Sequence, residues 1–157
     1  MLDDEKTAEE IVDILDLEPL PLEGGRWVQT FKDKNSTAIY YLLSKNNFSA
    51  IHKLKSTEIY HYYAGAPAQM LLLSSVGKIE EPILGTDLDS GQRPQVIVEP
   101  GVWQGSKTTG EWTLLGTTMA PPYSEEIFQL ADREELIKGW PDIKQKIYEL
   151  TRSCSEE

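Results

Sequence analysis

Apolar and polar residues alternate along several short stretches of the chain, and a period of two is typical of strands with one buried face. In the run 48–54, one face carries Phe48, Ala50, His52 and Leu54, whereas the other carries Ser49, Ile51 and Lys53. Further runs rich in β-branched, aromatic or aliphatic residues lie at 37–43, 58–65, 68–75, 94–100, 102–106, 111–119 and 125–130. Turn residues separate these runs about every 8 to 12 positions. The pattern predicts an all-β sandwich or barrel.

Helical periodicity is confined to the two ends of the chain. Residues 7–17 are predicted to form an N-terminal helix that Thr7 opens as part of a capping box. Residues about 132–151 are predicted to form one or two C-terminal helices, which Gly139 and Pro141 separate. We therefore expect helices packed outside a barrel.

The length of 157 residues suits a single domain. We place it over residues 1–157, with the barrel at about 22–130. The net charge of −11 opposes binding to a nucleic-acid polymer. No apolar run approaches the roughly 18 residues of a membrane span, so no membrane partner is expected. Because the first ten residues are acidic and lack an apolar segment, we expect no signal peptide and a cytoplasmic location.

Cysteine and histidine are scarce in this chain. Cys154 is the single cysteine, which excludes an internal disulfide and a zinc site built from thiolates. The two histidines are His52 and His61. Positive charge is locally dense at Lys45, Lys53 and Lys55. A small polar or anionic ligand is therefore compatible with the acidic chain.

Three polar side chains are candidates for the interior of the barrel. His52 shares its face with apolar residues, Glu58 begins the next run, and Gln104 follows the turn at Pro100-Gly101. Tyr60 lies on the same side of its run as Glu58. Such a set could orient a ligand or carry out acid–base chemistry. It could equally be a hydrogen-bonded polar cluster in the core.

The chain resembles the cupin superfamily at the residues of its two sequence motifs, namely His52, Leu54, Glu58, Gly65, Gly91, Pro100, Gly101 and Gln104. It is most similar to the branch called cupin 5, or DUF985. The matching strings are EGGRWVQTF, STAIYYLL, FSAIHKLKSTEIYHYYAGAPAQMLLL, VIVEPGVWQG, EWTLLGTTMAP and IFQLADREELIKGWP, between about residues 17 and 141. The resemblance implies a jelly-roll barrel (a double-stranded β-helix) and usually a homodimer.

The resemblance also implies where a metal would be held. Metal-bearing cupins supply two histidines and a glutamate from the first motif and another histidine from the second. Here His52 and Glu58 are kept, but Leu54 and Gln104 stand at the positions of the other two histidines. Since first-row metal sites generally need three or more protein donors, we expect no metal and no cofactor. If a metal does bind, the donors would be His52, Glu58 and Gln104.

Cupins that epimerise nucleotide-linked keto-sugars also lack the full metal set. The resemblance therefore implies a metal-free pocket for a sugar, a nucleotide or a nucleotide-linked sugar. In that chemistry, His52 would remove a proton next to a carbonyl, and Glu58 would hold its tautomer. Tyr60 or Tyr62 would return a proton.

The remaining predicted ligand contacts are Tyr40, Tyr62, Gln104, Trp112 and Lys107. Trp112 could stack on a base or a sugar, or it could lie in the core. Lys107 could meet a phosphate or point into solvent. Two other functions remain open: a metal-dependent oxygenase or isomerase, and a non-catalytic dimeric binding or scaffold module.

Overall fold

Two antiparallel sheets of six strands each form the centre of the protein. The computed structural model describes residues 5–75 and 77–153, so Cys154 lies outside the described residues. In the first sheet the strand order is β1-β2-β3-β11-β5-β9, and in the second it is β12-β4-β10-β6-β7, with β8 also paired to β6. The crossing of the chain between the two sheets is that of a jelly-roll barrel.

The strands of the first sheet are β1 (Glu18–Pro19), β2 (Arg26–Lys32), β3 (Thr37–Ser44), β5 (Glu58–Gly65), β9 (Gln95–Val98) and β11 (Trp112–Met119). Those of the second are β4 (Ser49–Leu54), β6 (Ala68–Leu73), β7 (Ile79–Glu80), β8 (Ile83–Leu84), β10 (Trp103–Thr108) and β12 (Phe128–Leu130). Short 3-10 turns lie at η1 (Leu88–Ser90), η2 (Glu125–Ile127) and η3 (Pro141–Ile143).

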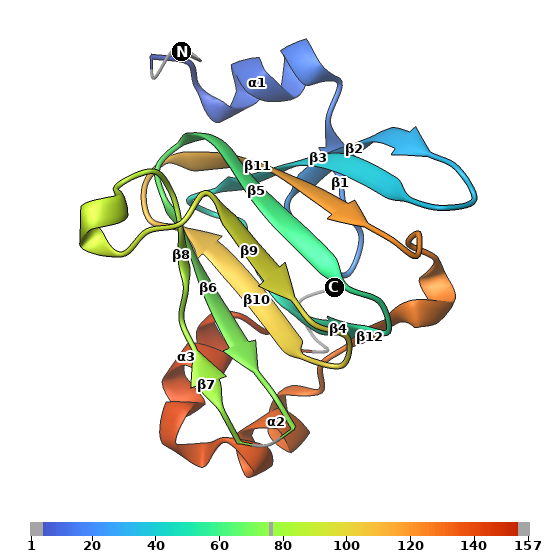
Figure 1. Ribbon diagram of the computed structural model, residues 1–157. Helices are drawn as coiled ribbons and strands as arrows, with labels where there is room; N and C mark the ends of the chain where they lie inside the picture. The colour runs from blue at the N-terminus through green and yellow to red at the C-terminus, as the bar shows by residue number, and fades with distance from the viewer. Residues whose placement is uncertain (1–4, 76, 154–157) are drawn as a thin grey trace.

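Helices cover the outside of both sheets (Figure 1). Helix α1 (Ala8–Leu15) lies on the first sheet, whereas α2 (Arg133–Gly139) and α3 (Lys144–Glu149) lie beneath the second. Thr7 caps α1 in a reciprocal capping box, as the sequence predicted. None of the helices in the described ranges is long and apolar enough to cross a membrane.

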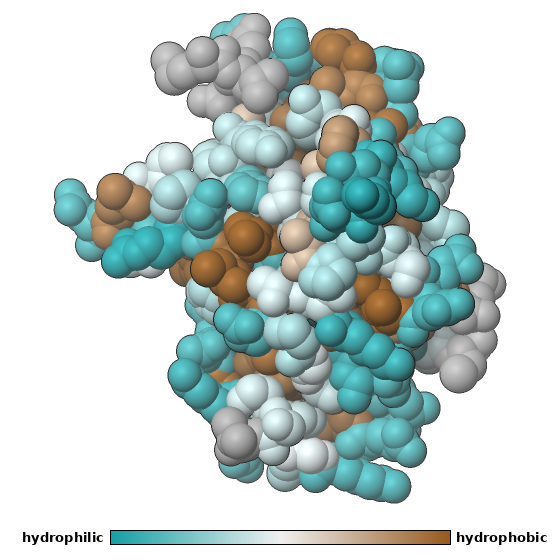
Figure 2. Space-filling view, turned by 45° about the vertical axis from the view of Figure 1, so that its right-hand side comes forward, coloured by the Kyte–Doolittle hydropathy of each residue, from teal (hydrophilic) through white to brown (hydrophobic). Residues whose placement is uncertain are grey.

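The main apolar core lies between the sheets. It includes Tyr41, Leu43, Tyr60, Ala68, Met70, Leu72, Leu84, Val96, Val98 and Leu115. Two further clusters form where α1 packs on the first sheet and where α2 and α3 pack on the second. On the face that Figure 2 shows, hydrophobic residues appear in small separate patches between hydrophilic ones. The inward-facing residues of both sheets therefore surround the interior in which the candidate side chains lie.

The prediction of an all-β barrel with helices at both ends is confirmed. The observed elements begin and end within a few residues of the predicted runs. The two-residue strands β1, β7 and β8 were not predicted, because two residues are too short to show a period. The run 125–130 is a strand only in its second half, where Phe128 follows the turn η2.

Two glycines with the same backbone conformation provide a test of this packing. Gly65 and Gly91 both have φ of 88°. A Cβ on Gly65 would lie 2.5 Å from the ring of Trp112, whereas one on Gly91 would meet nothing within 4 Å. We expect Gly91→Ala to lower the free energy of unfolding by about 1–2 kcal/mol through its left-handed backbone. Gly65→Ala should cost a further ~1–3 kcal/mol through overlap with Trp112. Urea denaturation measures both, and equal losses would contradict the described packing at Trp112.

Candidate functional site

A turn between β1 and β2 places a carboxylate at the barrel interior. Residues 20–25 reverse the chain, with Leu20 N donating to Gly25 O and Gly24 N donating to Leu20 O, both at 3.0 Å. Gly24 and Gly25 have φ of 92° and 80°, which glycine adopts without strain. The hydroxyl of Tyr41 donates to the carbonyl of Gly24 from inside the barrel. The turn therefore carries the side chain of Glu23 toward strand β4.

His52 on β4 meets this carboxylate. The ring is 1% exposed, and Nε2 lies 2.8 Å from Oε1 of Glu23, an ion-pair distance. Nδ1 lies 2.7 Å from the carbonyl of Ala50, which can only accept, so Nδ1 carries a proton. Nε2 must also be protonated to face a carboxylate favourably. The ring of Phe128 stacks on the imidazole at a centroid distance of 5.2 Å.

The surroundings of His52 favour the imidazolium. Burial alone would lower the pKa of His52. The charge of Glu23 and a hydrogen bond with it, together with the charge of Glu58 and the Ala50 carbonyl, outweigh burial and raise the pKa to about 9. His52 is therefore a fixed positive charge at neutral pH.

Glu58 begins β5 and faces the same interior, 7% exposed. Burial and the nearby charge of Glu23 raise its pKa to about 7, although His52 and hydrogen bonds with Thr117 and Gln104 oppose the rise. Within residues 5–75 and 77–153, Oε1 of Glu58 and Oε1 of Gln104 accept no hydrogen bond. A carboxyl group that titrates near neutral pH thus lies beside the imidazolium with unused acceptor capacity.

Two tyrosines lie beside these carboxyl groups. Burial and the charge of Glu58 raise the pKa of Tyr60 well above its usual value, and Tyr60 also hydrogen-bonds Glu58. Burial and the charge of Glu23 raise the pKa of Tyr41 in the same way. Both hydroxyls therefore stay protonated at neutral pH. We call His52, Glu23, Glu58, Tyr60, Tyr41, Gln104 and Thr117 the barrel cluster.

Of the predicted ligand contacts, Gln104 faces the barrel cluster, paired in register with His52. Tyr62 packs against the barrel core, but its hydroxyl donates to Gly65 O at 2.5 Å. Tyr40 and Trp112 lie on the outer face of the first sheet, because strand alternation turns them away from inward-facing Tyr41 and Thr113. Trp112 is buried under α1 and donates Nε1–H to Lys6 O at 2.8 Å.

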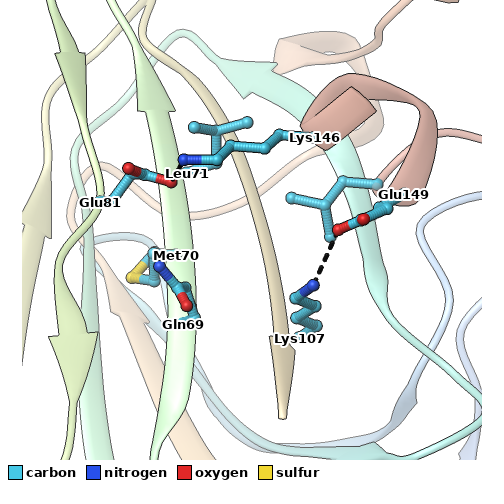
Figure 3. Close-up of a pocket in the computed structure, with 8 residues that line it drawn as sticks. Gln69, Met70, Leu71, Glu81, Lys107, Lys146 and Glu149 are labelled. Atoms are coloured by element: carbon cyan, nitrogen blue, oxygen red, sulfur yellow. Dashed lines mark hydrogen bonds and ion pairs between the residues drawn. The ribbon is translucent and has the colours of Figure 1, made fainter. Parts of the chain in front are cut away.

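Lys107 also points away from the barrel cluster. It lies outside the second sheet and pairs with Glu149 of α3 at 2.9 Å, beside a second ion pair between Lys146 and Glu81 (Figure 3). These groups line a hollow of about 240 Å³. Since both lysines are matched by carboxylates, the predicted phosphate contact of Lys107 has no support in its surroundings.

Sequence reasoning missed Glu23, Tyr41 and Thr117. Glu23 lies in a turn, where no periodicity indicates direction, and its signal is the Gly24-Gly25 pair that allows the turn. Tyr41 and Thr117 lie inward on β3 and β11, and alternation could have placed them there. Glu23 also takes the role predicted for Glu58, because it is the carboxylate in contact with His52.

The donor set does not suit a metal ion. Among the described residues, no group of three or more His, Cys, Asp or Glu side chains is arranged to hold one. His61, the other imidazole, lies on the outer face of the first sheet, 2.9 Å from Thr118 Oγ1. In the barrel cluster, Nε2 of His52 instead faces the carboxylate of Glu23.

The raised pKa of Glu58 predicts a pH-dependent effect on stability. A carboxyl group whose pKa rises from 4.5 to about 7 on folding stabilises the fold below pH 4.5 and loses that contribution as the pH rises through 7. Glu58→Gln has no carboxyl group to ionise at this position, so it does not lose stability in this way as the pH rises. We expect the variant to gain stability relative to wild type, on the order of 2 kcal/mol, between about pH 5 and pH 8.

Urea denaturation at several pH values measures this difference. The titration of His52 occurs in both proteins, so it largely cancels in the comparison. Glu111→Gln, an exposed carboxyl group, serves as the control and should show no such change with pH. A stability difference that is constant between pH 5 and pH 8 would contradict the placement of Glu58.

Comparisons with known proteins agree with this architecture. The family model Cupin_5, described as Cupin superfamily (DUF985), matches residues 9–131. Protein SO0799 from Shewanella oneidensis has 27% identity and a TM-score of 0.89, covering 94% of this chain and 98% of its own. A hypothetical protein from Leishmania major has 22% identity and a TM-score of 0.85, with coverages of 94% and 100%.

More distant structures share the fold alone. A cupin 2 conserved barrel domain protein from Rhodopseudomonas palustris has 14% identity and a TM-score of 0.60, covering 95% of this chain and 87% of its own. An oxalate decarboxylase from Bacillus subtilis has 13% identity and a TM-score of 0.60, covering 87% of this chain and 38% of its own. Among curated protein sequences, none matches. With most of its length matched by the family model, the chain belongs to the cupin superfamily, in the family Cupin_5 (DUF985).

Proposed function

We propose that this cupin binds a small polar molecule at the barrel cluster and transfers a proton on it without a metal. The observation that carries the proposal is Glu58, a carboxyl group with a pKa of about 7 and an unused acceptor oxygen beside an imidazolium. A general base is most effective when its pKa lies near the working pH. Glu58 meets that condition, whereas His52 is already protonated.

The roles in the barrel cluster follow from these protonation states. The Glu58 carboxylate would remove a proton next to a carbonyl, and the imidazolium of His52 would stabilise the negative charge that develops on the carbonyl oxygen. Tyr60 would donate its hydroxyl proton to the carbanion carbon. The protonated Glu58 then returns a proton to the Tyr60 phenolate through their hydrogen bond. The enzyme is restored, and the proton on the substrate carbon has been exchanged for one from the enzyme.

A sugar, a nucleotide or a nucleotide-linked keto-sugar is the substrate class that we propose. Cupins with that chemistry also lack the full metal set. The clustered oxygen acceptors and phenols of the barrel suit a ligand rich in hydroxyl groups. A purely structural cluster would leave fewer acceptors unpaired in the described part of the chain. A cytoplasmic location remains a prediction.

For the homodimer implied by the family resemblance, we propose the outer face of the first sheet beside α1. Tyr63 stacks with His61 and meets Tyr40 edge to face, and Gln95 reaches His61. Ile97 at the edge of this face is 57% exposed. Burial lowers the pKa of His61, so its ring is neutral near pH 7. Two copies with a net charge of −11 each would repel one another least through uncharged side chains such as these.

Deuterium uptake tests the proposed proton transfer. Incubation with nucleotide-linked keto-sugars in D₂O should place deuterium on the carbon next to the carbonyl. Glu58→Gln and Tyr60→Phe should each slow uptake by about 10²- to 10⁴-fold, because each removes a proton-transfer group. Mass spectrometry of the recovered sugar measures the rate.

Exposed groups of the same chemistry provide the controls. Glu111→Gln and Tyr148→Phe remove a carboxylate and a phenol far from the barrel cluster and should not change uptake. Exchange that does not depend on Glu58 would overturn the proposal. If a ligand stabilises the protein but no deuterium exchange occurs, ligand binding is supported and proton transfer is contradicted. A ligand at 100 times its Kd should raise the free energy of unfolding by about 2.7 kcal/mol.

The dimer face is tested by one charge placed on it. Ile97→Glu should shift the protein from dimer to monomer in sedimentation equilibrium, since burying an unpaired carboxylate is unfavourable. Ile79→Glu introduces the same charge on the second sheet, where Ile79 is 40% exposed, and should leave the dimer intact. A monomeric wild type, or an Ile97→Glu dimer of unchanged strength, would exclude this face.

A further inference from the structure

The guanidinium of Arg152 connects three separate parts of the chain. Nη1 donates to the carbonyl of Glu23 at 3.0 Å. Nη2 donates to Asn47 Oδ1 and to Phe48 O, both at 3.1 Å. Its Cζ also lies 4.0 Å from the centre of the Phe48 ring. Arg152 thus joins the C-terminal segment to the turn that carries Glu23 and to the turn between β3 and β4.

Two further hydrogen bonds from barrel residues hold the backbone of the Glu23 turn. The carbonyl of Glu23 also accepts from Ala50 N at 2.7 Å, and Tyr41 holds the carbonyl of Gly24. A Cβ on Gly24 would overlap Arg152, so the guanidinium packs directly against the turn. These three contacts, to the consecutive carbonyls of Glu23 and Gly24, therefore fix the backbone next to the Glu23 side chain, and Arg152 supplies one of them.

The turn carries backbone strain and borders a hollow. Leu22 has φ of 67°, a left-handed conformation that costs free energy in a residue with a side chain, and it is 58% exposed. Outside the turn lies a hollow of about 670 Å³, lined in part by Leu22, Gly24, Arg133 and Arg152. Contacts such as that of Arg152 therefore hold a strained turn in place.

Arg152 is itself anchored by the C-terminal helices. Nε of Arg133, on α2, donates to Thr151 Oγ1 at 2.7 Å, and Nη2 donates to Thr151 O at 2.5 Å. The Thr151 hydroxyl donates to Ile147 O of α3 at 2.7 Å. The residue before Arg152 is thus fixed to both helices.

We propose that Arg152 is a positioning residue of the barrel cluster: it holds the turn at residues 20–25 so that the Glu23 carboxylate stays against Nε2 of His52. This extends the proposed function by assigning control of the His52 charge to the C-terminal segment. Arg152 lies beyond residues 9–131, the part that the family model matches.

The charged groups that act on His52 come from two elements. Glu23 acts from the turn and Glu58 from β5, while Ala50 on the same strand accepts from Nδ1. Loss of Arg152 should weaken the contribution of Glu23 and leave that of Glu58. The imidazole, still buried, would then lose its proton at a lower pH.

NMR of ring-labelled histidine measures this directly, because His52 and His61 are the only histidines, and His61→Gln assigns the signals. In wild type, His52 should remain an imidazolium up to about pH 9. In Arg152→Ala its titration should move down by about one pH unit or more. Arg152→Lys should restore part of the shift. Lys107→Ala removes an ion-paired cation outside the barrel and should leave the titration unchanged.

A double variant separates positioning from general stability. In Glu23→Gln the titration should already be low, and adding Arg152→Ala should cause no further shift. If Arg152→Ala does not fold, Gly24→Ala takes its place, because a Cβ on Gly24 would overlap Arg152 and displace the turn. The His52 titration should then also move to lower pH. A lower melting temperature with an unchanged His52 titration in either variant would overturn the proposal. The His52 titration is measured without a ligand, so it can be interpreted even if the exchange assay fails.

Discussion

The buried ion pair between the imidazolium of His52 and the carboxylate of Glu23 is the interaction on which the candidate site depends. Moving two charges out of water costs several kcal/mol per ion, and attraction offsets that cost only when further hydrogen bonds complete the pair. Here the carbonyl of Ala50 accepts a hydrogen bond from Nδ1–H of His52, and the carbonyl of Glu23 accepts from both Ala50 N and Arg152. The geometry of a surface turn is therefore tied to the charge of a core residue.

The same ion pair also affects the pKa of its neighbour Glu58. The barrel cluster has two carboxyl groups and one imidazolium, and Glu23 is the one in direct contact with the cation. Glu58 is left with a smaller electrostatic benefit, so burial raises its pKa toward neutrality. Glu58 lies beside His52 only because the two sheets face each other, since Glu58 begins a strand of the first sheet and His52 lies on the second. Groups with such separated pKa values are typical of acid–base sites.

Alternation along the strands predicted much of the fold and part of the site. It correctly predicted that His52 and Glu58 face inward, because a period of two fixes the direction of each side chain once one face of the strand is apolar. The same rule places Trp112 and Lys107 on the outer faces of the sheets, away from the barrel cluster. Glu23 could not be found in this way. Its direction depends on a turn whose position is set by Arg152, a contact between residues 129 positions apart in the chain.

The covering of the second sheet by α2 and α3 affects how the barrel can be isolated. A recombinant fragment limited to residues 9–131 would contain every strand of the described structure yet lack α2 and α3. Ile51, Leu71 and Leu73, now buried against those helices, would become a solvent-facing apolar surface. Such surfaces promote self-association. Trimming the protein to the residues that the family model matches would thus yield an aggregation-prone product instead of a minimal barrel.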